Sequence, residues 1–196
     1  MCSLPPKLEN TLYHVSSILS RLGVVWVLAG STASCLNGVE VKPKDIDIIV
    51  KTENVYDVDR IFASIYRVLR RVRYGSNGVY SSYYGIFETH GVKIEVMADL
   101  KICGELGCLD VDFEELYGLS RRIELRDTSL RVAPLEWQLV ANTLIPGKEE
   151  RIKKILGVLM IKGINTKTLE LVLSKAPLGV RKYVIKLLKD KGITCK

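Results

Sequence analysis

Two aspartates lie one residue apart in the apolar segment "DIDIIV", residues 45–50. Residues two apart in a strand point to the same face, so Asp45 and Asp47 are expected side by side, about 7 Å apart at Cα. Carboxylates among isoleucines are costly unless something pairs them, and their mutual repulsion favours a cation between them. Mg²⁺ takes one or two protein carboxylates and fills its other positions with water and substrate phosphates. The sequence therefore predicts a divalent metal site on this strand.

A glycine-serine pair precedes the acidic strand and predicts an anion site. The apolar run "VVWVLA", residues 24–29, ends at Gly30 and Ser31, which begin a short helix expected over residues 30–36. Such a helix start offers unpaired backbone N–H groups, and glycine allows a ligand to approach closely. Lys44, just before the acidic strand, is a candidate phosphate partner, as is Lys42. An anion site beside a metal site is what a metal-chelated triphosphate requires.

The elements that position these residues follow from hydrophobic periodicity and from glycine and proline breaks. Strands are expected at 24–29 and 45–50, with one hairpin over 78–98 and a smaller one over 121–134. Helices are expected at 7–23, 30–36, 56–72, 134–145, 148–163, 166–176 and 178–192. The chain is therefore predicted to be α+β, with a core at residues 1–133 and a helical C-terminal region at 134–196.

The order strand, Gly-Ser, helix and Asp-x-Asp, over about residues 24–99, resembles the signature of the polymerase-β-type nucleotidyltransferase superfamily. That resemblance implies a mixed sheet flanked by helices. The segment "VAPLEWQLVANTLIPGKEERIKKIL", residues 132–156, is similar to the helical region of small stand-alone prokaryotic members, including antitoxin-type nucleotidyltransferases. Those relatives often carry a Lys-Asp pair where this chain has Lys148-Glu149-Glu150-Arg151, which leaves the subfamily open.

The resemblance implies a third carboxylate on a neighbouring strand, and "GVKIEVMADL", residues 91–100, fits it. Glu95 is our choice and Asp99 the reserve. With Asp45 and Asp47, the third acid would hold two Mg²⁺ ions, for which Mn²⁺ can substitute. Gly30 and Ser31 would hold the β- and γ-phosphates of an NTP, for which ATP is our expectation.

The implied reaction transfers a nucleoside monophosphate from the NTP to an acceptor and releases pyrophosphate. A small molecule, an RNA and a protein all remain open as acceptor. Two other functions stay open as well. One is a catalytically silent binding or regulatory module, such as a toxin–antitoxin partner, and the other is a nucleic-acid binder.

The chain is basic, and the excess lies in its C-terminal region. The net charge is +7 over 196 residues, and from Lys148 onward there are 13 Lys and Arg against 4 Asp and Glu. Such a distribution suits an anionic partner, although lysine-rich helix faces are usually solvated surface. The arginines at 67, 70, 71 and 73 allow the same two interpretations, and the tyrosines of "VYSSYYGIF" either pack or line an acceptor groove.

The apolar fraction and the cysteines bound the class of protein. An apolar content of 47% is ample for a packed core, and no apolar run approaches a membrane span. The N-terminus "MCSLPPKLEN" lacks the pattern of a signal peptide, so we expect a cytoplasmic monomer or homodimer that binds no membrane. None of the five cysteines forms a CxxC pair, which argues against structural zinc, but Cys103 and Cys108 can bridge a turn.

Overall fold

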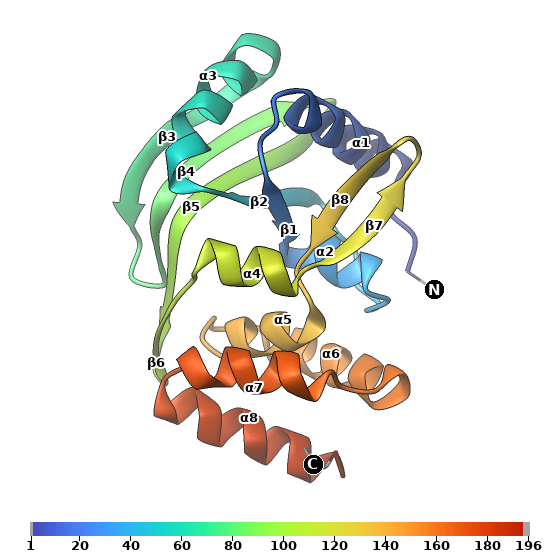
Figure 1. The fold of residues 1–196 in the computed structure, drawn as a ribbon, viewed down its shortest axis with the longest axis vertical. Helices are drawn as coiled ribbons and strands as arrows, with labels where there is room; N and C mark the ends of the chain where they lie inside the picture. The colour runs from blue at the N-terminus through green and yellow to red at the C-terminus, as the bar shows by residue number, and fades with distance from the viewer. Residues whose placement is uncertain (1, 194–196) are drawn as a thin grey trace.

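The computed structural model describes residues 2–193 and has a mixed eight-stranded sheet with helices on both faces (Figure 1). The strand order is β3-β4-β5-β2-β1-β8-β7, and β6 pairs with β5 beside this path. The strands are β1 (Trp26–Ala29), β2 (Asp45–Val50), β3 (Arg67–Ser76), β4 (Tyr80–Thr89), β5 (Val92–Gly104), β6 (Gly107–Asp110), β7 (Arg121–Leu125) and β8 (Thr128–Val132). The helices are α1 (Pro6–Arg21), α2 (Gly30–Leu36), α3 (Val55–Ile65), α4 (Phe113–Leu119), α5 (Leu135–Asn142), α6 (Glu149–Lys162), α7 (Thr166–Lys175) and α8 (Leu178–Asp190), with a short 3-10 turn, η1 (Thr52–Asn54).

The two faces of the sheet bury different hydrophobic clusters. Alternate residues of β2 point to opposite faces, so Ile46 and Ile48 pack in a cluster with α1 and α3, which includes Phe62. On the other face, Ile49 packs in a second cluster with the C-terminal helices, which includes Leu139. In Figure 1, α1 and α3 lie towards the top of the view, and α5 to α8 form a layer at the bottom. The observed class is α+β, as the sequence predicts.

The central strands bring the glycine-serine turn next to the acidic strand. Strand β1 is antiparallel to β2, which pairs Ala29 with Asp47, and β2 is parallel to β5, which pairs Asp47 with Glu95. Since Gly30 directly follows Ala29, the turn and two carboxylates meet at one place on the sheet. The fold thereby joins residues that are far apart in the sequence.

The predicted helix over 56–72 is wrong in its second half. Helix α3 ends at Ile65, and the chain turns into the edge strand β3 after Tyr66, whose backbone is extended. Val68 and Leu69, which helical spacing assigns to the buried face, are exposed. The turn is held by buried Asp59 of α3, whose carboxylate accepts hydrogen bonds from the Arg71 guanidinium at 2.6 Å and the Val72 backbone N–H at 2.9 Å. These contacts between α3 and β3 stabilise the strand, so the chain does not continue as a helix after Ile65.

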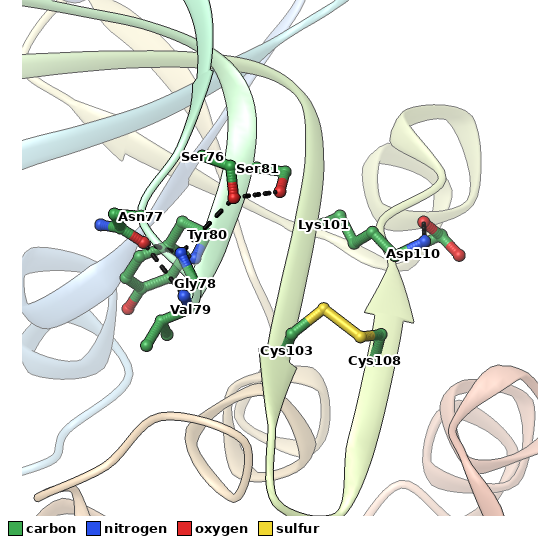
Figure 2. The surroundings of a disulfide bond; sticks show 10 residues. All are labelled: Ser76, Asn77, Gly78, Val79, Tyr80, Ser81, Lys101, Cys103, Cys108 and Asp110. Atoms are coloured by element: carbon green, nitrogen blue, oxygen red, sulfur yellow. Dashed lines mark hydrogen bonds and ion pairs between the residues drawn. A yellow bond between two sulfur atoms is a disulfide. The ribbon is translucent and has the colours of Figure 1, made fainter.

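Strand β6 and helix α4 lie in a region that the sequence analysis leaves unassigned. Cys103 of β5 and Cys108 of β6 form a disulfide, as the sequence allows, and a second disulfide, which the sequence did not indicate, joins Cys2 to Cys35. Figure 2 shows the first of them beside the turn between β3 and β4, where the Cys103 backbone N–H donates to the Val79 carbonyl at 2.7 Å. No helix in residues 2–193 is both long and apolar enough to cross a membrane.

Candidate active site

A cavity of about 690 Å³ lies between the sheet and the first two C-terminal helices. Strands β2, β4 and β5 form one wall, edge strand β3 and the turn after it form the rim, and α5 and the start of α6 form the opposite wall. The carboxylates that line it are Asp45, Asp47 and Glu95, and Gly30 and Ser31 line it beside them. The predicted metal residues and the Gly30-Ser31 pair therefore face one cavity, together with basic groups from the β3 rim and from the start of α6.

Hydrogen bonds fix Asp45 and the first turn of α2 against each other. The Ser31 hydroxyl donates to Asp45 Oδ1 at 3.2 Å, and the Thr32 hydroxyl donates to the Asp45 backbone carbonyl at 2.6 Å. Gly30 adopts φ +63°, and a Cβ at this position would lie 1.7 Å from Asp47 Oδ2. Because only glycine leaves room there, the Asp47 carboxylate rests directly on the Gly30 backbone. The pair of acids and the glycine-serine turn thus form one packed unit.

The environment of Asp47 strongly favours its neutral form. Burial, followed by the nearby Asp45 and Glu95 carboxylates, raises the pKa of Asp47 to about 8. Arg151 and Lys148 act in the opposite direction but do not cancel these effects. A carboxyl group with so high a pKa marks a place where positive charge would be strongly stabilised.

Glu95 is tied to the β4 side of the cavity. The Tyr84 hydroxyl donates to Glu95 Oε2 at 2.7 Å, and the Arg70 guanidinium lies over the Tyr84 ring, with Cζ 5.1 Å from its centroid. Burial raises the pKa of Glu95, and burial together with the Glu95 hydrogen bond raises the pKa of Tyr84. Within residues 2–193, Glu95 Oε1 has no hydrogen-bond partner, so this oxygen is available to a ligand.

The carboxylates do not by themselves form a closed metal cluster. In the described part of the chain, no three His, Cys, Asp or Glu side chains are grouped as a metal site would require. Asp45 and Asp47 lie on one face of β2, and Glu95 is the register partner of Asp47 on β5, with its Oε2 held by the Tyr84 hydroxyl. The structure thus places the three acids on two neighbouring strands, in one wall of the cavity.

Two residues considered in the sequence analysis lie elsewhere. Lys44 is exposed and is not among the residues that line the cavity. Asp99 is also exposed, because β5 has an irregularity opposite β4 at this point, and Asp99 adopts φ +51°. That irregularity breaks the alternation that would otherwise put Asp99 on the same face as Glu95.

Several cavity residues were not predicted to belong to the site, although the sequence indicated Arg70 as a possible contact for an anionic partner. Lys148 and Arg151 come from the start of α6 and reach towards Asp47, although the sequence marks them only as a charged segment. Asn142 of α5 and Arg70 of β3 line the cavity as well. Each contributes a buried polar atom, Asn142 Oδ1 and Arg70 Nε, and these two atoms have no hydrogen-bond partner within residues 2–193. Buried polar atoms are usually hydrogen-bonded, so these two mark a part of the cavity wall where the polar groups are not fully paired.

No protein-family model and no curated protein sequence matches this chain. Among solved structures, it is similar to TM1012 of Thermotoga maritima, a candidate nucleotidyltransferase, with 30% identity over 81% of this chain and 96% of that chain, at a TM-score of 0.64. An antigenic nucleotidyltransferase-like protein of Paracoccidioides brasiliensis has 13% identity, covering 96% of this chain and 91% of its own, at a TM-score of 0.58. The antibiotic-resistance factor ANT(2″)-Ia has 13% identity and covers 94% of both chains at a TM-score of 0.53. The last two similarities concern the fold alone.

Proposed function

The chain belongs to the nucleotidyltransferase superfamily, a class of transferases, and from that premise we propose that it transfers a nucleoside monophosphate from an NTP to an acceptor hydroxyl. ATP is the donor that we expect. The observation that carries the proposal is the cavity in which Asp45 and Asp47 lie beside the Gly30-Ser31 turn and opposite two cations. This arrangement offers separate places for a metal ion, for a triphosphate and for a second substrate.

The donor set fits Mg²⁺. Asp45 and Asp47 offer two carboxylates on one face of β2. Mg²⁺ commonly binds one or two protein carboxylates when substrate phosphates and water complete its coordination shell. The raised pKa of Asp47 supports a cation here, because positive charge would relieve the repulsion among the acids. Glu95, through its unpartnered Oε1, is our proposed third ligand. Bound Mg²⁺, or Mn²⁺ in its place, would activate the acceptor hydroxyl and neutralise charge on the leaving pyrophosphate.

The phosphates of the NTP are assigned to two groups of residues. The Gly30 backbone and the Ser31 hydroxyl lie next to the acids, and Lys148 and Arg151 approach Asp47 from α6. Cations and hydroxyl groups at this position hold a triphosphate in line with the acceptor, and positioning accounts for most of the rate in phosphoryl-type transfers. Lys148 and Arg151 replace Lys44 in our proposal, because they line the cavity.

The chemical step forms one bond and breaks another. The acceptor hydroxyl oxygen bonds to the α-phosphorus, the bond from that phosphorus to pyrophosphate breaks, and the hydroxyl proton passes to a carboxylate of the site. Glu95 is our choice for that carboxylate, because burial raises its pKa and it lies beside the pair of acids on β2. Pyrophosphate leaves with the charge that Lys148 and Arg151 offset.

Substitution of single carboxylates tests the proposal. We expect Asp47→Asn and Glu95→Gln to lower label transfer from α-labelled ATP about 100-fold or more, because each removes a group that acts at the reacting phosphorus. Asp99→Asn is the matched control, since Asp99 is an exposed carboxylate of the same strand as Glu95, outside the cavity. Transfer should be assayed with a panel of RNA, small-molecule and protein acceptors in the presence of Mg²⁺. Full transfer by Asp47→Asn would refute the role given to this carboxylate, whereas no transfer by the wild type to any acceptor of the panel would refute the proposal and favour a silent binding module.

A further inference from the structure

The cavity contains more positive groups than one nucleotide requires. Lys148 and Arg151 approach Asp47 from the α6 side, whereas Arg70 and Arg73 line the cavity from edge strand β3. If the first pair faces the triphosphate, the second pair is left for another ligand. This inference rests on the proposed function, because it assigns the second substrate of the same site.

Arg70 and Arg73 differ from their neighbours on β3 in having no acidic partner. Arg67 pairs with Glu88 at 3.2 Å, and Arg71 pairs with Asp59 at 2.6 Å. Across residues 2–193, by contrast, Arg70 and Arg73 form no ion pair and no hydrogen bond through their side chains. Arg70 is half-buried and Arg73 is exposed at the rim, so both charges are free to pair with an anionic ligand in the cavity.

The irregular pairing of β3 turns both arginines towards the cavity. Residues three apart in a regular strand point to opposite faces, but the register between β3 and β4 shifts between Arg70 and Arg73. The shift allows both to line the cavity, while Val72 between them packs in the core with α3. A local departure from regular strand geometry thus gathers two positive charges at one rim.

Arg70 is held in place by an aromatic ring, and no carboxylate within residues 2–193 pairs with its charge. Its guanidinium lies over the Tyr84 ring, 5.1 Å from the centroid, and its buried Nε has no partner. Tyr84 in turn donates to Glu95 at 2.7 Å, so one tyrosine separates the guanidinium from the proposed reacting carboxylate. If a ligand places a hydroxyl group at Glu95, the chemical group next to that hydroxyl would therefore lie near the Arg70 guanidinium.

We propose that Arg70 and Arg73 form a phosphate subsite for the acceptor, which is therefore a phosphorylated compound whose hydroxyl lies near that phosphate. Guanidinium groups match the oxygen geometry of phosphate with paired N–H donors. The acceptor side of the cavity has Glu95 as its carboxylate, and two arginines beside it would repel a polycationic acceptor. A nucleoside monophosphate and the 3′ end of an RNA share this chemistry.

Binding to the full-length chain tests the inference without any need for turnover. In a first titration, a non-hydrolysable ATP analogue is added with Mg²⁺, and its binding reports on the proposed function alone. In a second titration, the chain saturated with that analogue receives either AMP or a short oligoribonucleotide with a 3′ hydroxyl group. We expect both phosphate compounds to bind, and a higher affinity of the oligoribonucleotide would identify RNA as the source of the phosphate, whereas equal affinity would identify a mononucleotide.

Variants locate the subsite. Arg70→Gln and Arg73→Gln should each weaken binding in the second titration about tenfold, since each removes a charge-assisted contact, and should leave the first titration unchanged. Arg67→Gln is the matched control, because Arg67 lies on the same strand and pairs with Glu88 outside the cavity. Wild-type binding by both Arg70→Gln and Arg73→Gln would overturn the inference. So would the absence of AMP and oligoribonucleotide binding to a chain that binds the ATP analogue, and that result leaves the proposed function intact.

Discussion

Replacing Gly30 with alanine should disable the site through a single methyl group. The new Cβ would lie 1.7 Å from Asp47 Oδ2 and 2.6 Å from its Cγ, whereas real Cβ contacts are essentially never shorter than 3.0 Å. The carboxylate must therefore move by more than 1 Å. A displacement of about 1 Å at a reacting centre can cost about 100-fold in rate, so we expect label transfer from α-labelled ATP to fall about 100-fold.

The backbone at this position contributes a separate effect, which a matched variant removes. Gly30 has φ +63°, a conformation that costs an L-residue about 1–2 kcal/mol. Gly23 has φ +64° with no atom within 4 Å of the corresponding Cβ, so Gly23→Ala carries the same backbone cost without the contact. Both variants should lose about that much stability in denaturant unfolding, with a further loss in Gly30→Ala from the contact itself.

The rate of label transfer from α-labelled ATP should differ between the two variants. Gly23→Ala should retain wild-type transfer at a temperature where it is folded, whereas Gly30→Ala should not. Equal transfer by the two variants, with both folded, would refute the argument that Asp47 depends on the missing side chain of Gly30.

Three further outcomes follow from the structure. The pKa of Asp47 is about 8 in the folded protein against an ordinary value of 3.8, so metal-free stability should fall as pH rises from about 4 to 8. Asp47→Asn should reduce that fall to the part that Glu95 contributes, and at pH 8 Mg²⁺ should raise the thermal midpoint of the wild type more than that of this variant. Asp59→Ala should cost about 2 kcal/mol in denaturant unfolding, because it removes the charge-assisted contacts that hold β3 to α3, and an unchanged midpoint would contradict that role. In oxidised protein, Cys35→Ser should cost about 4 kcal/mol and Cys108→Ser about 2, because the disulfides span 33 and 5 residues, and the reverse order would count against the loop-entropy argument.

The local patterns near the acids were sufficient to predict the central part of the fold. Alternating apolar residues identify β2, and the glycine-serine break identifies the start of α2, which the structure places at Gly30. Asp45 and Asp47 face the same cavity because strand geometry fixes their direction. Local sequence determines these features, so a single chain reveals them.

Edge strand β3 could not be predicted in the same way. Val72 is its one buried residue, so the strand shows no alternation of apolar and polar side chains, and the helical spacing of α3 continues into it by chance. Helix α4 carried a usable signal, because Asp112 caps it by accepting from the Glu115 backbone N–H, an Asp-x-x-Glu pattern typical of helix starts. The Cys2–Cys35 pairing had no such signal, because spacing in sequence does not specify a long-range partner.

The helical C-terminal region contributes to the site as well as to the core. Lys148 and Arg151 approach Asp47, and Trp137 of α5 both lines the cavity and packs in the cluster that includes Val27 of β1. The division into residues 1–133 and 134–196 therefore stays a prediction from the sequence. Residues from both ranges line the cavity. Since the acids and the cations that offset them come from opposite sides of that division, the proposed phosphate-binding groups are in place only when the helices are docked. Changes on the helical side should then alter nucleotide affinity, whereas changes on β3 should alter the choice of acceptor.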